Sequence, residues 1–318
     1  MCYSAYIEGD YRKYVKKFGA RLDLAEFERL YRERLRGGKL KVPKAVDDAF
    51  GQPGASGEQA IKALIDEFNA QQATKLEQEV FAQRERLAKA DRALETRATK
   101  AAAESKRIAT DKISAALRRL EDITRSTPKD RDSRIFPGYY APVMVMEDGE
   151  PVIKPMRYQC RIAGKPANYD IKYSATYNAR RDNLGGFWKP LFGRTHGILL
   201  VDVFFENVKR HKMEGRELRP GEQEENVVIE FNPNPTQQMH VACLWSKWTN
   251  GTEELLSFAA ITDEPPAEVL AAGHDRCIVP IQPNYVESWL NPSMDDLEAQ
   301  QAILEDRDRP FYEHRLAA

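Results

Sequence analysis

The sequence predicts an α+β protein with a mixed, largely antiparallel β core, flanking helices and a long inserted α-helical arm resembling a coiled coil. Residues 58–127 contain neither Gly nor Pro, which indicates continuous helix. After Pro128, short apolar runs alternate with Gly, Pro and Asn, which is typical of strands and turns. The 318 residues suffice for two domains and a sizeable core.

The predicted arm is rich in Ala, Leu, Glu, Lys, Arg and Gln, and an unbroken helix over these residues would reach about 105 Å. Its basic half, Arg84 to Arg125, holds 12 Lys and Arg against 7 Asp and Glu, and most of these charges are expected on a solvated face. Small and apolar residues recur at three-and-four spacing, so we expect a coiled-coil spacer or dimer seam rather than direct ligand binding. This stripe consists of Ile61, Leu64, Ile65, Phe68, Leu76, Val80, Leu87, Leu94, Ala98, Ala101, Ile108, Ile113, Leu117, Leu120 and Ile123.

The remaining elements follow from apolar runs and turn residues. Residues 24–36 predict a shorter helix, and 37–57, with Gly, Pro and Ser, predict a loop. Further helices are expected at 266–272 and 285–290. The expected strands are 141–146, 198–205, 227–231, 240–245, 257–262 and 277–280.

Composition narrows the function classes. Lys and Arg number 48 against 49 Asp and Glu, so net charge favours no polyanionic partner and any basic groove must be local. The four cysteines, far apart, form no CxxC pair and no zinc pattern, and we expect no metal and no cofactor. No apolar run is long enough to span a bilayer, so we expect a cytoplasmic protein without a membrane partner.

Cys2 is the most informative residue because it directly follows Met1. Methionine aminopeptidase removes Met1 before a small side chain, so we expect a mature chain that begins with a free α-amine and a thiol on one residue. The two groups have ordinary pKa values of about 7.7–8.0 and about 8.5. Such a residue can form an imine with an aldehyde and then close the thiol onto it as a thiazolidine. The ordinary interpretation is a small second residue without chemistry.

Three further segments carry candidate chemistry. Tyr177–Arg180 is expected as a polar loop in which an amide could hold the N-terminal residue and an arginine could bind a phosphate. Glu206 ends a strongly apolar strand, and burial there would raise its pKa toward the range useful for proton transfer. His274 precedes a predicted strand and could move a proton near neutral pH. The ordinary interpretation of Tyr177–Arg180 is a turn with a surface arginine. That of Glu206 is a strand-end acid that points to water, and that of His274 is an exposed loop histidine.

The order of these blocks resembles the SOS response-associated peptidase (SRAP) family, whose members form covalent cross-links with abasic sites in DNA. The resemblance covers about residues 1–15 and 135–292, and the helical arm looks like an insertion. We therefore expect a SRAP-like core at 1–17 and 129–300, the arm at 18–128 and a C-terminal tail at 301–318. The blocks that carry the resemblance are Met1-Cys2, Tyr177–Arg180, Phe204–Glu206, Cys243–Trp248, His274–Pro280 and Trp289-Leu290.

The resemblance implies a role for each matching residue. Cys2 would be the nucleophile, Asn178 would position it, and Glu206 and His274 would transfer protons. Arg180, with Arg181 beside it, would contact DNA phosphate. A base could stack on Phe187 or Trp188, although a buried core aromatic is the ordinary interpretation. The chain departs from the usual family pattern at Tyr3, Ser4, Arg181, Asp182, Asn183, Phe205, Asn207, Cys277 and Ile278.

These inferences predict covalent capture of abasic sites in single-stranded DNA through Cys2, in a nucleoid-associated protein of bacterial or phage origin. Two alternatives belong to other classes. One is a thiol peptidase or self-processing activity. The other is a non-catalytic protein that self-associates or binds a protein partner through the helical arm.

Overall fold

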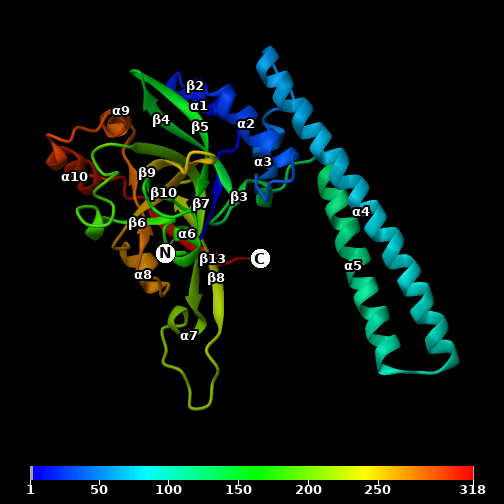
Figure 1. Ribbon diagram of the computed structural model, residues 1–318. Helices are drawn as coiled ribbons and strands as arrows, with labels where there is room; N and C mark the ends of the chain where they lie inside the picture. The colour runs from blue at the N-terminus through cyan, green and yellow to red at the C-terminus, as the bar shows by residue number, and fades with distance from the viewer. Residues whose placement is uncertain (1–2, 318) are drawn as a thin grey trace. The chain divides into compact units, whose positions relative to one another are not determined.

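The computed structural model describes residues 3–317, which divide into two compact units (Figure 1). The first contains residues 3–30, 39–52 and 130–317, and the second contains residues 31–38 and 53–129. The first unit is an α+β body and the second is a helical arm, so the predicted fold class is confirmed. No helix in the described part of the chain is long and apolar enough to cross a membrane.

The strands of the first unit form one continuous sheet that closes on itself. The order runs β9-β10-β5-β4-β7, and β7 also pairs with β9, which completes a barrel. Closure removes the free edges that would otherwise expose unpaired backbone groups. The bounds are β4 Tyr140–Glu147, β5 Glu150–Tyr158, β7 His196–Lys209, β9 Met239–Thr249 and β10 Glu254–Asp263.

Local sequence explains the central hairpin and the barrel core. Asp148 and Gly149, both with positive φ, connect β4 to β5 by the two-residue turn that suits the twist of antiparallel strands. The strands read as apolar runs because most of their side chains are buried. The predicted strand 198–205 is the middle of β7, which extends to 14 residues.

Several shorter strands extend the barrel wall. β1 (Ser4–Ile7) lies between β7 and β3 (Arg134–Ile135), and β8 (Asn226–Asn234) pairs with β7. The C-terminal residues are not a tail: β13 (Phe311–Leu316) pairs antiparallel with β8, and Tyr312 is buried against Phe204. The remaining strands are β2 Arg21–Leu22, β6 Asn178–Arg180, β11 Cys277–Ile278 and β12 Pro280–Ile281.

Helices flank the barrel, and one of them packs a tryptophan against it. Trp289 stacks on His196 with ring centroids 3.9 Å apart and donates to the Gly197 carbonyl oxygen at 3.0 Å. The predicted helices at 24–36, 266–272 and 285–290 are confirmed, whereas the expected loop at 37–57 contains α3. The helices are α1 Tyr11–Phe18, α2 Leu24–Leu35, α3 Lys44–Asp48, α6 Tyr169–Lys172, α7 Arg210–Met213, α8 Ala267–Ala271, α9 Val286–Leu290 and α10 Leu297–Glu305.

The arm is a helical hairpin rather than one unbroken helix. α4 (Ser56–Thr96) and α5 (Lys100–Thr124) pack side by side (Figure 1). The chain reverses at residues 97–99, where the Thr99 hydroxyl accepts from the Ala102 backbone N–H at 3.2 Å and begins α5. The buried alanines of α5 recur every seven residues, as in a coiled-coil seam. They are Ala102, Ala109 and Ala116.

Candidate functional site

Glu206 and His274, predicted from distant segments, lie together in the first unit. Glu206 is near the C-terminal end of β7, and His274 lies in the loop between α8 and β11. His274 Nε2 is 3.4 Å from Glu206 Oε2. Glu206 is fully buried and His274 is 8% exposed, so neither ordinary interpretation, a solvated acid or an exposed histidine, holds.

Burial determines the protonation of this pair. Desolvation raises the pKa of Glu206 well above its ordinary value, and a hydrogen bond from the Tyr3 backbone N–H opposes this effect. Desolvation lowers the pKa of His274. His274 Nδ1 lies 2.8 Å from the Arg276 carbonyl oxygen and 3.4 Å from the Arg276 backbone N, and the shorter contact favours the tautomer with the proton on Nδ1. Desolvation therefore favours the neutral form of both the carboxyl and the imidazole.

The N-terminal strand brings the start of the chain to this pair. The Tyr3 N–H donates to the Phe205 carbonyl oxygen at 3.3 Å, and Ser4 is in register with Phe205. The residue before Glu206 in β7 is thus paired with the beginning of β1. Cys2 itself lies outside the described residues.

Asn178 is on a strand, not in a loop. Residues 178–180 form β6, which runs parallel to β10 with Asn178 opposite Ala260, because the backbone groups of this segment pair with the barrel. Asn178 is 5% exposed, and among the described residues neither of its amide atoms has a hydrogen-bond partner. Buried amides are nearly always satisfied, so this one needs an explanation. Within residues 3–317 no hydrogen bond joins it to Glu206 or His274.

The two predicted DNA-binding arginines have different surroundings. The Arg181 guanidinium lies 3.0 Å from Asp263 and 2.6 Å from Glu305, and its side chain is 19% exposed. Arg180 is 48% exposed and pairs with Asp182, which is also 4.0 Å from Arg276. Arg276 follows His274 by two residues, and our sequence analysis did not select it. Its position in the His-Asp-Arg block was the available signal.

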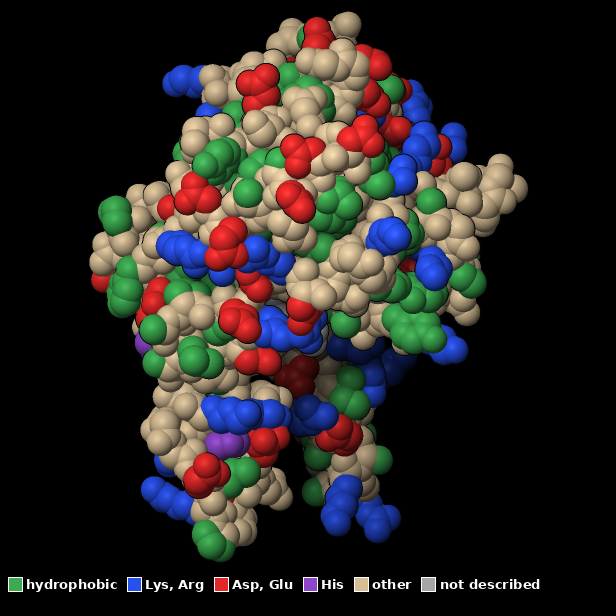
Figure 2. All heavy atoms as spheres, turned by 90° about the vertical axis from the view of Figure 1, so that its left-hand side faces the viewer, with side chains coloured by type: hydrophobic (Ala, Val, Ile, Leu, Met, Phe, Trp, Pro, Cys, Tyr) green, Lys and Arg blue, Asp and Glu red, His purple; other side chains and the backbone are tan. Residues whose placement is uncertain are grey.

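The aromatic residues proposed for stacking also differ. Trp188 is 3% exposed and belongs to the core, which agrees with the ordinary interpretation. Phe187 is half-buried and stacks on Tyr169 with ring centroids 6.2 Å apart. On the face shown in Figure 2, basic and acidic side chains are interleaved, in keeping with the balanced composition.

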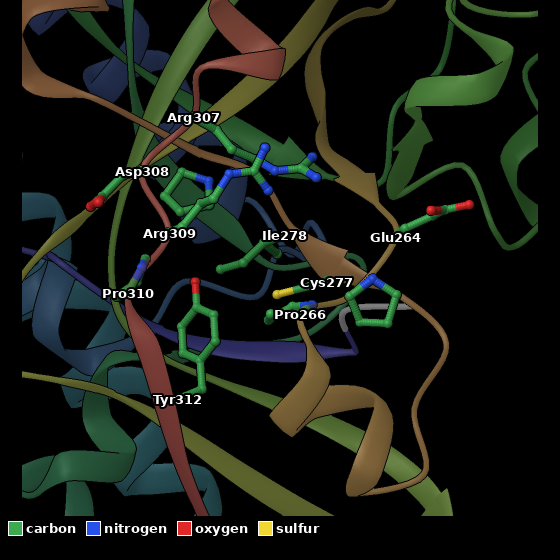
Figure 3. Close-up of a pocket in the computed structure, with 11 residues that line it drawn as sticks. Glu264, Pro266, Cys277, Ile278, Arg307, Asp308, Arg309, Pro310 and Tyr312 are labelled. Atoms are coloured by element: carbon green, nitrogen blue, oxygen red, sulfur yellow. The ribbon is translucent and has the colours of Figure 1, made fainter.

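The cysteines of the described region are poor nucleophiles. Cys160, Cys243 and Cys277 are buried free thiols, and burial raises the pKa of each, that of Cys160 to about 12. Cys277 and Tyr312 line a cavity of about 250 Å³ with Arg307 and Glu264 (Figure 3). The thiolate needed for attack is therefore disfavoured at all three positions. Residues 3–317 contain no group of three or more His, Cys, Asp or Glu that could hold a metal ion.

The first unit is thus a closed α+β barrel with a buried acid–imidazole pair beside its N-terminal strand. Residues 92–316 match the SOS response associated peptidase (SRAP) family, so the chain belongs to this family. The family connects the protein with DNA damage and the SOS response, and with interaction with nucleic acid. No curated protein matches the chain.

Three of the solved structures that are similar to this chain come from Bordetella bronchiseptica and Bacteroides thetaiotaomicron. A protein of Bordetella bronchiseptica is 16% identical with a TM-score of 0.46, and the match covers 61% of this chain and 90% of that one. A protein of Bacteroides thetaiotaomicron is 15% identical with a TM-score of 0.44, and the match covers 58% of this chain and 78% of that one. A phage-related protein of Bordetella bronchiseptica is 16% identical with a TM-score of 0.44, over 61% and 85%.

Proposed function

We propose that this protein captures abasic sites in single-stranded DNA covalently through Cys2. The observation that carries the proposal is the buried Glu206–His274 pair, which contacts the backbone of Tyr3, the residue after Cys2. The chemistry also needs Cys2 to be the first residue of the mature chain, which the intact mass of the purified protein tests.

The proposed reaction has two additions. The ring-opened abasic sugar presents an aldehyde, and the neutral Cys2 amine adds to it to form a carbinolamine, which loses water to give an imine. The thiol then adds across the C=N bond: sulfur bonds to carbon and the thiol proton goes to nitrogen, which closes a thiazolidine. Protonated Glu206 is suited to donate a proton as the sugar ring opens and as water leaves. Neutral His274 is suited to accept one, or to assist reversal.

The other candidate residues serve binding in this proposal. The unsatisfied amide of Asn178 is available to position Cys2 for attack. Arg180, half exposed, can exchange Asp182 for a DNA phosphate with Arg276 close by. We assign no phosphate contact to Arg181, because Asp263 and Glu305 already hold its guanidinium.

A denaturing gel tests the proposal. Protein mixed with single-stranded DNA that carries an abasic site should give a band that survives boiling in SDS. Cys2→Ala, and protein with an uncleaved N-terminal tag, should give none. Equal cross-linking by Cys2→Ala would exclude Cys2 as the nucleophile.

A peptidase activity is the second candidate, because the family description itself names one. The same thiol would attack a peptide carbonyl, with His274 as the base. Cleavage of a peptide set that disappears in Cys2→Ala, together with an absence of DNA cross-links, would favour this activity.

A further inference from the structure

A cavity of about 430 Å³ adjoins the Glu206–His274 pair in the first unit. His274 forms part of its wall, and the rest comes from α7, the loop after it and the end of α8. Its volume is in the range of small-molecule sites. We name it the flank cavity; it is lined by Lys212, Gly215, Arg216, Glu217, Leu270, Gly273, His274 and Asp275.

We propose that the flank cavity binds the nucleobase of the nucleotide that adjoins the abasic residue. The inference rests on the proposed function, because that function places the abasic sugar at Glu206 and His274. Adjacent nucleotides in a strand are only several ångströms apart, so a base next to the lesion reaches a cavity that shares the His274 wall. Single-stranded DNA leaves such bases unstacked and free to bind protein surfaces.

The charges of the flank cavity favour a base over a phosphate. Lys212 and Arg216 are offset by Glu217 and Asp275. The Arg216 guanidinium also lies 2.6 Å from both Glu214 and Glu222, so its charge is neutralised. A phosphate would gain no net electrostatic attraction here, whereas binding of a neutral base does not depend on one.

Leu270 supplies the apolar contact. This residue is 59% exposed and belongs to the short helix α8, which contacts β13. A large aliphatic side chain at a cavity wall can cover one face of a planar base and gain free energy by excluding water. A Cβ at Gly215, another lining residue, would meet no atom within 4 Å, so this part of the wall is open.

Gly273 holds the two walls close together. Its φ is +91°, and a Cβ there would lie 2.8 Å from Val208 Cγ1 and 3.0 Å from Lys212 Cβ. Only glycine tolerates both the backbone conformation and the close approach. The loop before His274 is therefore fixed against α7, and the flank cavity is formed before any ligand binds.

Fluorescence anisotropy with non-reactive components tests the inference. The protein carries Cys2→Ala, and three oligonucleotides carry a tetrahydrofuran abasic analogue, internally, at the 5′ end or at the 3′ end. Leu270→Asp is compared with Leu218→Asp, which changes an exposed leucine of the neighbouring loop outside the flank cavity. Thermal melting verifies that both variants are folded.

Leu270→Asp should weaken binding of the internal analogue about tenfold. Of the two terminal analogues, each of which keeps a neighbouring base on one side only, Leu270→Asp should weaken binding of just one, the analogue whose remaining neighbour is the base that enters the flank cavity. Leu218→Asp should change the binding of none of the three. Unchanged binding by Leu270→Asp, or an equal loss on all three oligonucleotides, would overturn the inference. So would a lower salt dependence in Lys212→Ala without any effect of Leu270→Asp, since this would indicate a phosphate.

The measurement needs no covalent step. If protein with Cys2 forms no cross-link but Leu270→Asp gives the selective loss, the proposed chemistry fails and the base site stands. If protein with Cys2 forms the cross-link but Leu270→Asp has no selective effect, the base site fails and the proposed chemistry stands.

Discussion

The imidazole of His274 and the carboxyl of Glu206 are 3.4 Å apart, and both residues are buried from water. The two residues are 68 positions apart in the sequence and come from a loop and a strand. Burial raises the pKa of Glu206 and lowers that of His274, so it favours the neutral form of each. An acid and a base that do not neutralise one another are what a stepwise addition to an aldehyde requires.

Glu206→Gln should slow abasic-site cross-linking about 100-fold, because the amide keeps the shape of the side chain but cannot donate an acidic proton. The rate is measured by quenching the reaction at intervals and quantifying the SDS-stable band. Phe205 is the adjacent buried residue, and Phe205→Leu is the matched control that should leave the rate within a few-fold. An unchanged rate in Glu206→Gln would remove Glu206 from the chemistry.

The stability difference between Glu206→Gln and the unchanged protein should depend on pH. Burial raises the folded pKa of Glu206 above its unfolded value of about 4.3. The contribution of this carboxyl to stability is then fully present below the unfolded pKa and is lost as pH rises through the folded pKa. Thermal melts from pH 4 to pH 8 should therefore show the Gln variant gaining stability relative to the unchanged protein. A constant difference would show that the pKa is not raised.

Asn178→Ala should separate a positioning role from a structural one. Since the buried amide has no partner among residues 3–317, its removal should leave the melting temperature unchanged or slightly higher. The cross-linking rate should fall about tenfold or more if the amide holds Cys2. A large loss of stability with an unchanged rate would contradict the assignment.

Arg180→Ala should affect DNA binding, whereas Arg181→Ala should affect stability. Loss of Arg180 should weaken DNA binding and lower the salt dependence of log K by about one unit, with little change in stability. Loss of Arg181 should lower stability by about 1–3 kcal/mol, because Asp263 and Glu305 lose a partner, although Arg307 still pairs with Asp263. Anisotropy titrations at several salt concentrations and denaturant melts distinguish the two.

The arm should be removable without loss of the site. α3 and η1 (Asp130–Ser133) are in contact, so the chain leaves and re-enters the first unit at neighbouring points. Replacement of residues 56–124 by a short Gly/Ser linker should preserve cross-linking. If the arm is a dimer seam, light scattering should show loss of self-association in this variant. Loss of cross-linking in a folded variant would show that the arm contributes to substrate binding.

Most elements were predictable because their signals are local. Alternation of apolar runs with Gly and Asn located β4, β7, β8, β9 and β10 within a few residues. β5 and β13 were missed, since β5 carries two prolines and β13 carries charges. Both depend on pairing with strands that are distant or already formed, which no window of sequence contains.

The reversal of the arm was missed for a different reason. Residues 97–99 contain neither Gly nor Pro, and the only local signal was Thr99 as a helix cap. The two helices gain more by burying each other than one long helix gains from propensity.

The candidate site was predictable in its residues and not in its arrangement. Glu206 and His274 were selected from block order, but their 3.4 Å approach depends on the barrel and on the α8–β11 loop. Arg181 is held in ion pairs with Asp263 and Glu305, and only the tertiary fold brings these three residues together. The flank cavity depends on Gly273, whose positive φ cannot be read from its identity alone.

β7 is paired with other strands along both of its edges. Its partners are β1, β4, β8 and β9, and Glu206 lies in the part of β7 that pairs with β8, next to the part that pairs with β1. Amide hydrogens there should exchange with deuterium only when the whole barrel opens. The position of the Glu206 carboxyl is therefore fixed by the barrel itself and does not depend on the conformation of the surface loops.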